Sequence, residues 1–454
     1  MMKDRRLCVL ISVLFAGIVS PIQAQRLGYP PEEFIARRDV LCERLAHGTV
    51  LMFGNTMPAL AARNHQDHDF YYLTGNEDLN SVLVMNVETR QAYLFLPQQG
   101  PGEIRSDGEN WLEDPEAADK WGFESIEPLY TLNEFLARRR DYTKTPAIWV
   151  RLSERDEISQ SRSNKAVNLA RQSMNLWSAR PSEGAFRVEM LRRHYPFYEL
   201  KDISPHIDRM RVIKTAREIE ILKLNGRIAA EAVNRAMAVT EPGRFEYEIE
   251  AEATYHHVRN GVQRAGYGAI VGSGSNSNIW HYRDNGKRVE AGEMVVMDYG
   301  GSLDYMIIDI TRTWPVSGEF DELQLRAYRC ALEALKAITA EMRPGATREG
   351  IREITREIYR RHGFEDQRAP SAGHFVGMSV HDVGDASLPL EAGMVIAVEP
   401  IIEIKEENLH VRIEDTILVT EGEPVVLTGA SPKEVDELLA LMKEASQARG
   451  GPNR

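Results

Sequence analysis

Two aspartates lie in apolar runs that are typical of buried strands. Asp298 ends one such run and Asp309 ends the next, with a Gly-Gly pair between them. A hairpin centred between Leu303 and Asp304 would place the two carboxylates opposite each other on one face. Asp is depleted in strand interiors, and opposed like charges destabilise a hairpin, so we expect a cation between them. The alternative is that each aspartate faces solvent at a sheet edge.

Three further residues extend this set. Glu399 ends the apolar run 394–398, Glu414 lies within the strand-like segment 410–419, and His374 follows a glycine. Four carboxylates and one neutral imidazole carry a net charge of −4, which two divalent cations would balance. Without metal, each carboxylate pair about 4 Å apart would cost roughly 4 kcal/mol at an effective dielectric constant of about 20. Taken alone, a histidine in this place would more often be a core or loop residue with its hydrogen bonds satisfied.

The composition of this donor set limits the metal and its chemistry. Oxygen donors with a single imidazole suit Mn²⁺, Co²⁺ or Zn²⁺ and leave coordination positions open, and of these ions we expect Mn²⁺. A site with two such ions produces a hydroxide at neutral pH and stabilises both oxygens of a tetrahedral intermediate. The residues therefore predict metal-dependent hydrolysis.

The segments that must position these residues follow position 206. They alternate helix pairs with antiparallel hairpins, twice, which predicts an α+β domain over 206–440 with an internal pseudo-twofold duplication. The predicted helices span 216–239, 244–260, 322–342, 348–362 and about 432–449. Residues 441–454 form a C-terminal tail.

The preceding residues, 25–200, have a different pattern. A helical period over 30–46 is followed by strand-like runs at 49–53, 70–73, 81–85 and 92–96, and by a helical stretch at 132–139. This alternation predicts an α/β domain with a mixed sheet. Residues 151–200 are polar and basic, and we expect helices there.

Composition excludes several classes of protein. The chain has 454 residues, 43% of them hydrophobic, and a formal net charge of −13. These values exclude a disordered, collagen-like or disulfide-dense protein, and the acidic balance argues against nucleic acid as a partner. Of its three cysteines, we expect Cys42 and Cys330 to be buried thiols.

The first 24 residues have the pattern of a secretory signal peptide. A basic head is followed by the apolar run 7–19 and by small residues that end at Ala24. The run is too short for a comfortable membrane-spanning helix, and no later segment reaches that length, so we expect no stable membrane insertion. The pattern predicts export, to a periplasm or to the medium. The alternative is a core helix or an uncleaved anchor.

The order and spacing of motifs over 206–440 resemble the pita-bread metallopeptidase family, in its aminopeptidase P and prolidase branch. The resemblance rests on Ile270-Val-Gly-Ser-Gly274, His281-Tyr282, Val296-Met-Asp-Tyr-Gly300, Asp309-Ile-Thr-Arg-Thr-Trp314, Gly373-His374, Val380-His-Asp-Val-Gly384, Val398-Glu-Pro400 and Arg412-Ile-Glu-Asp415. The first domain adds Arg63-Asn64 and Asp69-Phe-Tyr-Tyr-Leu-Thr-Gly75, which resemble the N-terminal domain of aminopeptidase P.

The resemblance implies a role for each metal-site residue. Asp298 would be a terminal ligand on one metal ion, while Asp309 and Glu414 would bridge two ions. His374 and Glu399 would complete the second ion's ligands. Glu399 would also be the general base toward the bridging water, which requires a carboxylate within hydrogen-bond reach.

The resemblance also implies substrate-side residues and a quaternary structure. His281 and His381 would line the substrate site, and Arg412 would hold the substrate's carboxylate side or a metal ligand. Family members form homo-oligomers, dimers or tetramers. Trp111 either corresponds to a tryptophan that enters a neighbouring subunit's site or is an ordinary surface or core residue.

Two positions depart from the family pattern, and both concern substrate choice. Pro370 stands where a histidine is usual, and Glu403 stands where many aminopeptidases P have tyrosine. The predicted activity is removal of an N-terminal residue that precedes proline, by a metal-bridging hydroxide. The alternatives are an Xaa-Pro dipeptidase (prolidase) and a non-catalytic binding protein of the same fold. We expect His65-Gln-Asp-His68, which could suggest a second metal site, to be a solvated loop.

Overall fold

The computed structural model describes residues 27–56, 65–138, 146–175, 177, 181–366 and 373–449. The predicted signal peptide, the Arg63-Asn64 motif and Pro370 lie outside the described residues. In the described part of the chain, Cys42 and Cys330 are buried and unpaired with each other, as expected. None of the described helices combines the length and apolar character that a bilayer-spanning helix needs.

The N-terminal part contains a six-stranded mixed sheet, as predicted. Its strand order is β4-β3-β2-β1-β5-β6. Neighbours β1, β2 and β3 pair antiparallel, whereas β3–β4, β1–β5 and β5–β6 pair parallel. The strands are β1 (Thr49–Phe53), β2 (Val82–Asn86), β3 (Ala92–Leu96), β4 (Ser125–Pro128), β5 (Ala147–Val150) and β6 (Glu199–Asp202).

Helices cover this sheet, and one of them replaces a predicted strand. Residues 70–73 lie in helix α2 (His68–Thr74). The Asp67 side chain caps the helix by accepting a hydrogen bond from the Phe70 N–H at 3.1 Å, and Gly75 ends it with φ of 68°. These caps override the strand preference of the aromatic run.

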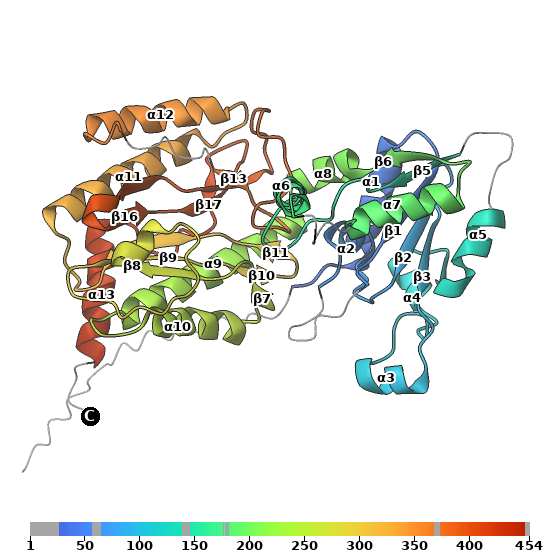
Figure 1. The fold of residues 1–454 in the computed structure, drawn as a ribbon, viewed down its shortest axis with the longest axis horizontal. Helices are drawn as coiled ribbons and strands as arrows, with labels where there is room; N and C mark the ends of the chain where they lie inside the picture. The colour runs from blue at the N-terminus through green and yellow to red at the C-terminus, as the bar shows by residue number, and fades with distance from the viewer. Residues whose placement is uncertain are drawn as a thin grey trace, which may run out of the picture.

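The other helices of the N-terminal part either agree with predicted helical stretches or form in segments for which no element was predicted. They are α1 (Pro31–Arg44), α3 (Pro101–Asp107), α4 (Ala117–Trp121), α5 (Leu132–Arg138), α6 (Arg162–Ser173) and α7 (Glu183–His194), with the 3₁₀ turn η1 (Leu129–Thr131). Helix α8 (Ser204–Val212) then leads from this part into the C-terminal part (Figure 1).

In the C-terminal part, strands lie between two helix pairs. Figure 1 shows α9 (Ala216–Val239) and α10 (Glu246–Arg259) along one side, and α11 (Glu322–Glu341) and α12 (Arg348–Arg361) along the other. Helix α13 (Val435–Arg449) closes one end. The helices agree with prediction to within a few residues. The internal duplication and the domain limits stay predictions.

The strands of this part form small antiparallel sheets. Their orders are β11-β10-β7, β12-β9-β8, β13-β14-β17-β18 and β15-β16. The strands are β7 (Arg264–Ala265), β8 (Ile270–Ser273), β9 (Met294–Asp298), β10 (Gly301–Leu303), β11 (Met306–Ile307), β12 (Thr311–Pro315), β13 (His374–Phe375), β14 (Val395–Val398), β15 (Ile401–Ile404), β16 (Leu409–Arg412), β17 (Asp415–Leu418) and β18 (Val425–Val426). The 3₁₀ turn η2 (Gly274–Asn278) follows β8, and the 3₁₀ turn η3 (Lys405–Glu407) connects β15 to β16.

The predicted register of the aspartate hairpin is wrong. Asp298 pairs with Thr311, and the turn is centred between Asp304 and Tyr305, one residue later than predicted. Both turn residues have positive φ, 46° and 67°, as a two-residue type I′ turn requires. Asp309 is therefore a diagonal neighbour of Asp298 rather than its partner. The Tyr305 ring stacks on Tyr71 of α2, with centroids 3.6 Å apart, so a tertiary contact accompanies this turn.

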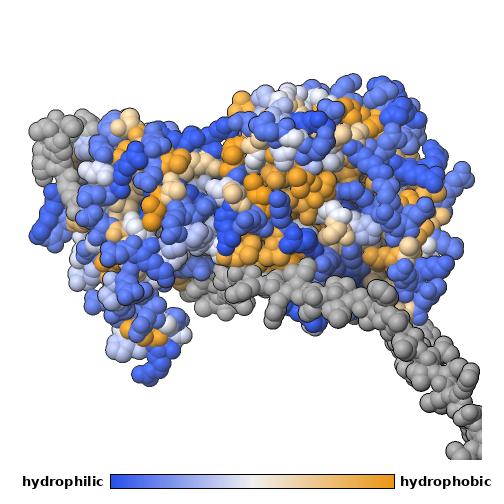
Figure 2. Space-filling model, turned by 180° about the vertical axis from the view of Figure 1, so that it is seen from behind, coloured by the Kyte–Doolittle hydropathy of each residue, from blue (hydrophilic) through white to orange (hydrophobic). Residues whose placement is uncertain are grey.

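Seen from behind, the surface is largely hydrophilic, and hydrophobic side chains gather over one area of the C-terminal part (Figure 2).

Candidate metal centre

Three of the predicted metal ligands lie together. Asp309, His374 and Glu414 offer ligand atoms that are all within 4.8 Å of one another. His374 Nε2 lies 3.4 Å from Asp309 Oδ2 and 3.9 Å from Glu414 Oε1. These residues come from three segments: the connection between β11 and β12, strand β13, and the junction of β16 with β17.

Backbone and threonine contacts bring the segments together. Glu414 forms a bridge with Thr311, in which its N–H donates to the Thr311 carbonyl at 2.9 Å. The Thr311 hydroxyl also donates to Glu414 Oε2 at 2.7 Å. Asp309 is held by Thr416, which accepts from the Asp309 N–H and donates to its carbonyl oxygen, at 3.2 and 2.7 Å. Thr311 therefore orients the Glu414 carboxylate, and Thr416 fixes the backbone that carries Asp309.

Asp298 joins this group through shared hydrogen-bond partners. Its Oδ1 accepts from the Tyr267 hydroxyl at 2.6 Å, and its Oδ2 accepts from Arg412 Nη2 at 2.8 Å. The same Tyr267 hydroxyl lies 2.5 Å from Asp309 Oδ1. A phenol has one proton, so it can serve one of these oxygens fully at a time. A cation between the carboxylates would remove the remaining repulsion.

The carboxylates are crowded enough to perturb their protonation. Burial raises the pKa of Asp298 to about 7, with Arg412 opposing this shift and Asp309 adding to it. Burial, together with the charges of Asp309 and Glu399, raises the pKa of Glu414 well above its usual range. Buried Glu414 Oε1 has no hydrogen-bond partner among the described residues. A metal ion would supply that partner, so the donor set fits divalent metal.

Glu399 completes the predicted set of five. It follows β14 directly, is half-buried, and lies near enough to act electrostatically on Asp298, His374 and Glu414. The structure thus places Asp298 and Glu399, the other two predicted ligand residues, beside the cluster of Asp309, His374 and Glu414. Their individual ligand roles stay predictions.

The two predicted substrate-side histidines differ in environment. The His381 ring stacks on the His374 ring, with centroids 4.1 Å apart. Burial, with the neighbouring His374, lowers the pKa of His381 to about 4. His281 lies on the exposed loop after η2, and partial burial together with Arg412 lowers its pKa. Both lowered pKa values favour the neutral imidazole at pH 7.

Sequence reasoning did not identify two residues that organise this site. Tyr267 contacts both aspartates, and a Tyr-Gly pair ahead of an apolar strand was its only signal. Glu246, the first residue of α10, accepts hydrogen bonds from the Ser273 N–H at 2.7 Å and the Tyr282 hydroxyl at 3.0 Å. Glu246 therefore ties down both ends of the segment that carries His281. Nothing in the local sequence around Glu246 indicates this role.

Glu403 and Trp111, two further residues singled out in the sequence, both contact aromatic rings of the same chain or lie close to them. Glu403 of β15 lies across from His410 of β16, with 3.9 Å between its Oε1 and His410 Nδ1. Trp111 stacks on Trp121 of the same chain, with centroids 4.5 Å apart. Its role toward a neighbouring subunit stays a prediction.

The prediction of a solvated loop at 65–68 is wrong. Gln66, Asp67 and His68 are buried, and His68 Nε2 lies 2.9 Å from His65 Nε2. The segment leads into the N-terminal end of α2 and packs against the Tyr305 turn, because Tyr305 stacks on His65. This pair of histidines belongs to no cluster of three potential ligands among the described residues.

Known proteins resemble this chain over both of its parts. Residues 220–421 match metallopeptidase family M24, and residues 34–149 match the aminopeptidase P N-terminal domain. The chain is 30% identical to the Xaa-Pro aminopeptidase of Haemophilus influenzae, over 91% of this chain and 97% of that protein. It is 36% identical to the Xaa-Pro dipeptidase of Pyrococcus furiosus, over 52% of this chain and 68% of that protein.

A solved structure agrees with these sequence matches. Aminopeptidase P from E. coli with the inhibitor Pro-Leu superposes with a TM-score of 0.76 at 27% identity. The superposition covers 92% of this chain and 100% of that one. The similarity thus includes the N-terminal sheet and the part that carries the clustered carboxylates.

Proposed function

Because the chain belongs to metallopeptidase family M24 and is a metallo-aminopeptidase of the aminopeptidase P type, we propose that it hydrolyses N-terminal Xaa-Pro bonds with two divalent metal ions. The observation that carries this proposal is the buried cluster of carboxylates around His374. In this cluster, Glu414 Oε1 has no hydrogen-bond partner among the described residues. Repulsion within the cluster favours binding of cations.

Five residues would hold the ions: Asp298, Asp309, His374, Glu399 and Glu414. When bound, the ions would supply a hydroxide nucleophile at neutral pH and polarise the scissile carbonyl. Mn²⁺ is the proposed ion, because oxygen donors dominate the set, with Co²⁺ or Zn²⁺ as alternatives.

The chain's own residues would move the protons and bind the peptide. Glu399 would accept the proton of the attacking water and later pass it to the leaving proline nitrogen. Neutral His281 and His381 each retain one N–H that can donate to the developing oxyanion. Arg412 donates to Asp298 at 2.8 Å, which favours a role in holding that ligand over a role toward the substrate's carboxylate.

A mixed-substrate assay tests the proposal. The mature protein, loaded with metal, is incubated with Xaa-Pro-Yaa and Xaa-Pro together, and the products are identified by mass spectrometry. We expect release of the first residue from the longer peptide. Cleavage of the dipeptide alone would favour the alternative, a dipeptidase like the Pyrococcus furiosus relative. If neither is cleaved while metal is bound, the proposed substrate class is wrong.

Metal content tests the site itself. Asp309→Ala removes a carboxylate that lies within reach of both His374 and Tyr267. We expect metal per chain to fall, measured by elemental mass spectrometry, and hydrolysis to fall at least about 100-fold. Adding Mn²⁺, Co²⁺ or Zn²⁺ back to chelator-treated wild type identifies the activating ion. Unchanged metal content in Asp309→Ala would exclude this residue as a ligand.

Export and self-association are also proposed. The pattern of residues 1–24 supports export by a cleaved signal peptide. Expression of the full chain in a Gram-negative host, with N-terminal sequencing of the periplasmic product, is expected to give a chain that begins near Gln25. The family resemblance supports a homo-oligomer, which sedimentation velocity of the mature protein tests directly.

A further inference from the structure

The loop that carries His381 is held from outside itself. Residues 376–384, here called the His381 loop, form almost no regular structure, yet most of them are buried. The N–H of Val380 donates to the carbonyl of Ile158 at 2.9 Å, so this loop contacts a segment of the N-terminal part. Its position therefore depends on groups far away in the sequence.

The strongest of these contacts is made by Asp382, the neighbour of His381. Its Oδ1 accepts from Arg211 Nη2 at 2.6 Å, and its Oδ2 lies 3.5 Å from Lys214 Nζ. All three side chains are almost completely buried. Gly377 makes room for this carboxylate, because a Cβ there would lie 2.0 Å from Asp382 Oδ2. The loop is thus shaped around the ion pair.

Arg211 carries the connection into the N-terminal part. It lies on α8, and its Nη1 donates to Asp69 Oδ1 at 2.7 Å and to Asp156 Oδ2 at 2.6 Å. Asp69 belongs to α2, and Asp156 precedes α6. One guanidinium group therefore joins two carboxylates of the N-terminal part to one carboxylate of the His381 loop.

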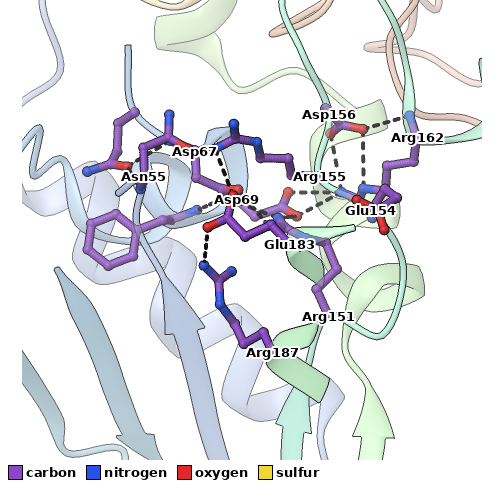
Figure 3. Close-up of polar contacts among 12 residues, drawn as sticks. Asn55, Asp67, Asp69, Arg151, Glu154, Arg155, Asp156, Arg162, Glu183 and Arg187 are labelled. Carbon is purple, nitrogen blue, oxygen red and sulfur yellow. Dashed lines mark hydrogen bonds and ion pairs between the residues drawn. The ribbon is translucent and has the colours of Figure 1, made fainter. Parts of the chain in front are cut away.

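Further buried charges fix these two carboxylates. Asp69 also accepts from Arg162 at 2.8 Å and from Arg151 at 3.0 Å, and Arg151 donates to Asp67 at 2.6 Å (Figure 3). The set consists of four carboxylates and four cations, each side chain at most 9% exposed, and Arg162 also pairs with the less buried Asp208 at 2.7 Å. This buried ion network consists of Asp67, Asp69, Arg151, Asp156, Arg162, Arg211, Lys214 and Asp382.

A network of this kind is an inefficient way to stabilise a fold. Removing so many charges from water costs about as much as their attraction returns, and apolar side chains of equal volume often stabilise a core as well. Apolar contacts, however, are not directional and do not fix the orientation of a side chain. Bonds between guanidinium and carboxylate groups fix the position and orientation of both partners. The network is therefore better suited to positioning than to stability.

We propose that the Asp382–Arg211 ion pair, through which the buried ion network contacts the His381 loop, positions His381 in the peptidase site, with Asp382 and Arg211 as positioning residues that link the N-terminal part to the reaction. This rests on the proposed function, because His381 is the residue whose placement matters. The His381 ring lies 4.1 Å from that of His374, so a shift of Asp382 moves it relative to the metal ligands. A misplacement of about 1 Å can reduce a rate about 100-fold.

Kinetics of two matched variants test the proposal. Asp382→Asn keeps the shape of the side chain and one acceptor but removes the charge that binds Arg211. We expect kcat on Xaa-Pro-Yaa to fall about 10- to 100-fold, with KM changed less than about threefold and metal content unchanged. Asp67→Asn is the control: it removes a carboxylate of the same network, retains the α2 cap, and does not touch the His381 loop. We expect it to lower the melting temperature similarly while kcat stays within about threefold of wild type.

Hydrogen exchange gives a readout that does not need peptidase activity. In metal-loaded protein without substrate, Asp382→Asn is expected to accelerate exchange of the amides of Val380 and Asp382 about tenfold, whereas Asp67→Asn leaves them unchanged. If wild type hydrolyses no Xaa-Pro peptide, the proposed function fails while this arm still reports on the network. Arg211→Lys keeps the positive charge but loses the guanidinium group that contacts Asp382 and the two N-terminal carboxylates at once. It replaces Asp382→Asn if that variant does not fold.

Three outcomes overturn the proposal. The first is a loss of kcat without faster exchange in the His381 loop, and the second is faster exchange with kcat unchanged. The third is an equal effect of Asp67→Asn and Asp382→Asn on kcat, which would show that the network acts only through general stability.

Discussion

At the scale of single residues, Tyr267 stands between the two aspartates that the sequence singles out. Its hydroxyl lies within 2.6 Å of Asp298 Oδ1 and 2.5 Å of Asp309 Oδ1. Partners of this kind hold ligand side chains in the orientation that a metal requires, and their loss typically costs 10- to 100-fold. We therefore expect Tyr267→Phe to weaken metal affinity or hydrolysis about 10- to 100-fold, measured by metal titration and by peptide hydrolysis.

Tyr299→Phe is the matched control for that variant. The Tyr299 hydroxyl accepts from Thr254 at 3.2 Å, and within the described part of the chain it forms no hydrogen bond to the clustered carboxylates. We expect both measurements to stay at wild-type values. A Tyr267→Phe variant that behaves like this control would contradict an orienting role for the phenol.

Asp298 gives a pH-dependent prediction for the metal-free protein. Burial raises its pKa to about 7, although Arg412 opposes the shift, whereas an unfolded Asp titrates near pH 4. Between about pH 4 and pH 7 the native state therefore holds a proton that the unfolded state has released. The contribution of this group to the free energy of unfolding falls as pH rises through that window.

Asp298→Asn lacks this titration and isolates its effect. We expect the free energy of unfolding of the metal-free variant, relative to that of metal-free wild type, to increase from pH 5 to pH 8. Urea denaturation at both pH values measures this difference. Added metal is expected to reverse the order at pH 8, because the variant has lost a ligand and the wild type has not. A difference in stability that does not vary with pH would contradict the raised pKa.

At the scale of elements, the long helices follow from sequence because their signals are local. The α9 prediction, 216–239, agrees with the structure at both ends, and Thr215 with Glu218 forms a capping box at its start. Residues 70–73 were predicted wrongly because a cap at Asp67 and a glycine at 75 outweighed an aromatic run. The register of the aspartate hairpin was also wrong, since it depends on which two residues accept positive φ.

Gly226, inside α9, gives a prediction whose sign is opposite to helix propensity. Replacing an interior helical glycine by alanine normally stabilises by up to about 1 kcal/mol. Here a Cβ would lie 2.3 Å from the backbone carbonyl oxygen of Leu427. We expect Gly226→Ala to destabilise by about 1–3 kcal/mol, measured by chemical denaturation. Gly102→Ala in α3, where a Cβ meets open space, is expected to leave stability unchanged or slightly raised.

At the scale of the whole molecule, buried ion pairs join the N-terminal and C-terminal parts. Arg37 of α1 donates to Glu218 of α9 at 3.0 Å, with both side chains almost fully buried. Removing one partner leaves a buried charge without compensation, which costs about 3–5 kcal/mol. We expect Arg37→Ala to lose about that much stability in chemical denaturation. Arg90→Ala, whose pair with Glu43 is exposed, is expected to lose less than about 1 kcal/mol.

The sequence by itself determined which residues are chemically unusual. Carboxylates that interrupt apolar runs at Asp298, Asp309, Glu399 and Glu414 are visible without a structure, because local propensity disfavours them there. The helix periods and the mixed sheet are equally local signals, and the motif order indicated the family. None of these required knowledge of what lies beside them in space.

Only the tertiary structure decided what surrounds those residues. Tyr267, Glu246 and the network that joins Arg211 to Asp382 act on the site from segments far apart in the chain. A tyrosine, a glutamate or an arginine is ordinary in its local sequence, and each becomes significant through burial and through its partner. Local propensities act over a few residues, whereas these contacts arise when distant segments pack, so no single stretch of sequence encodes them.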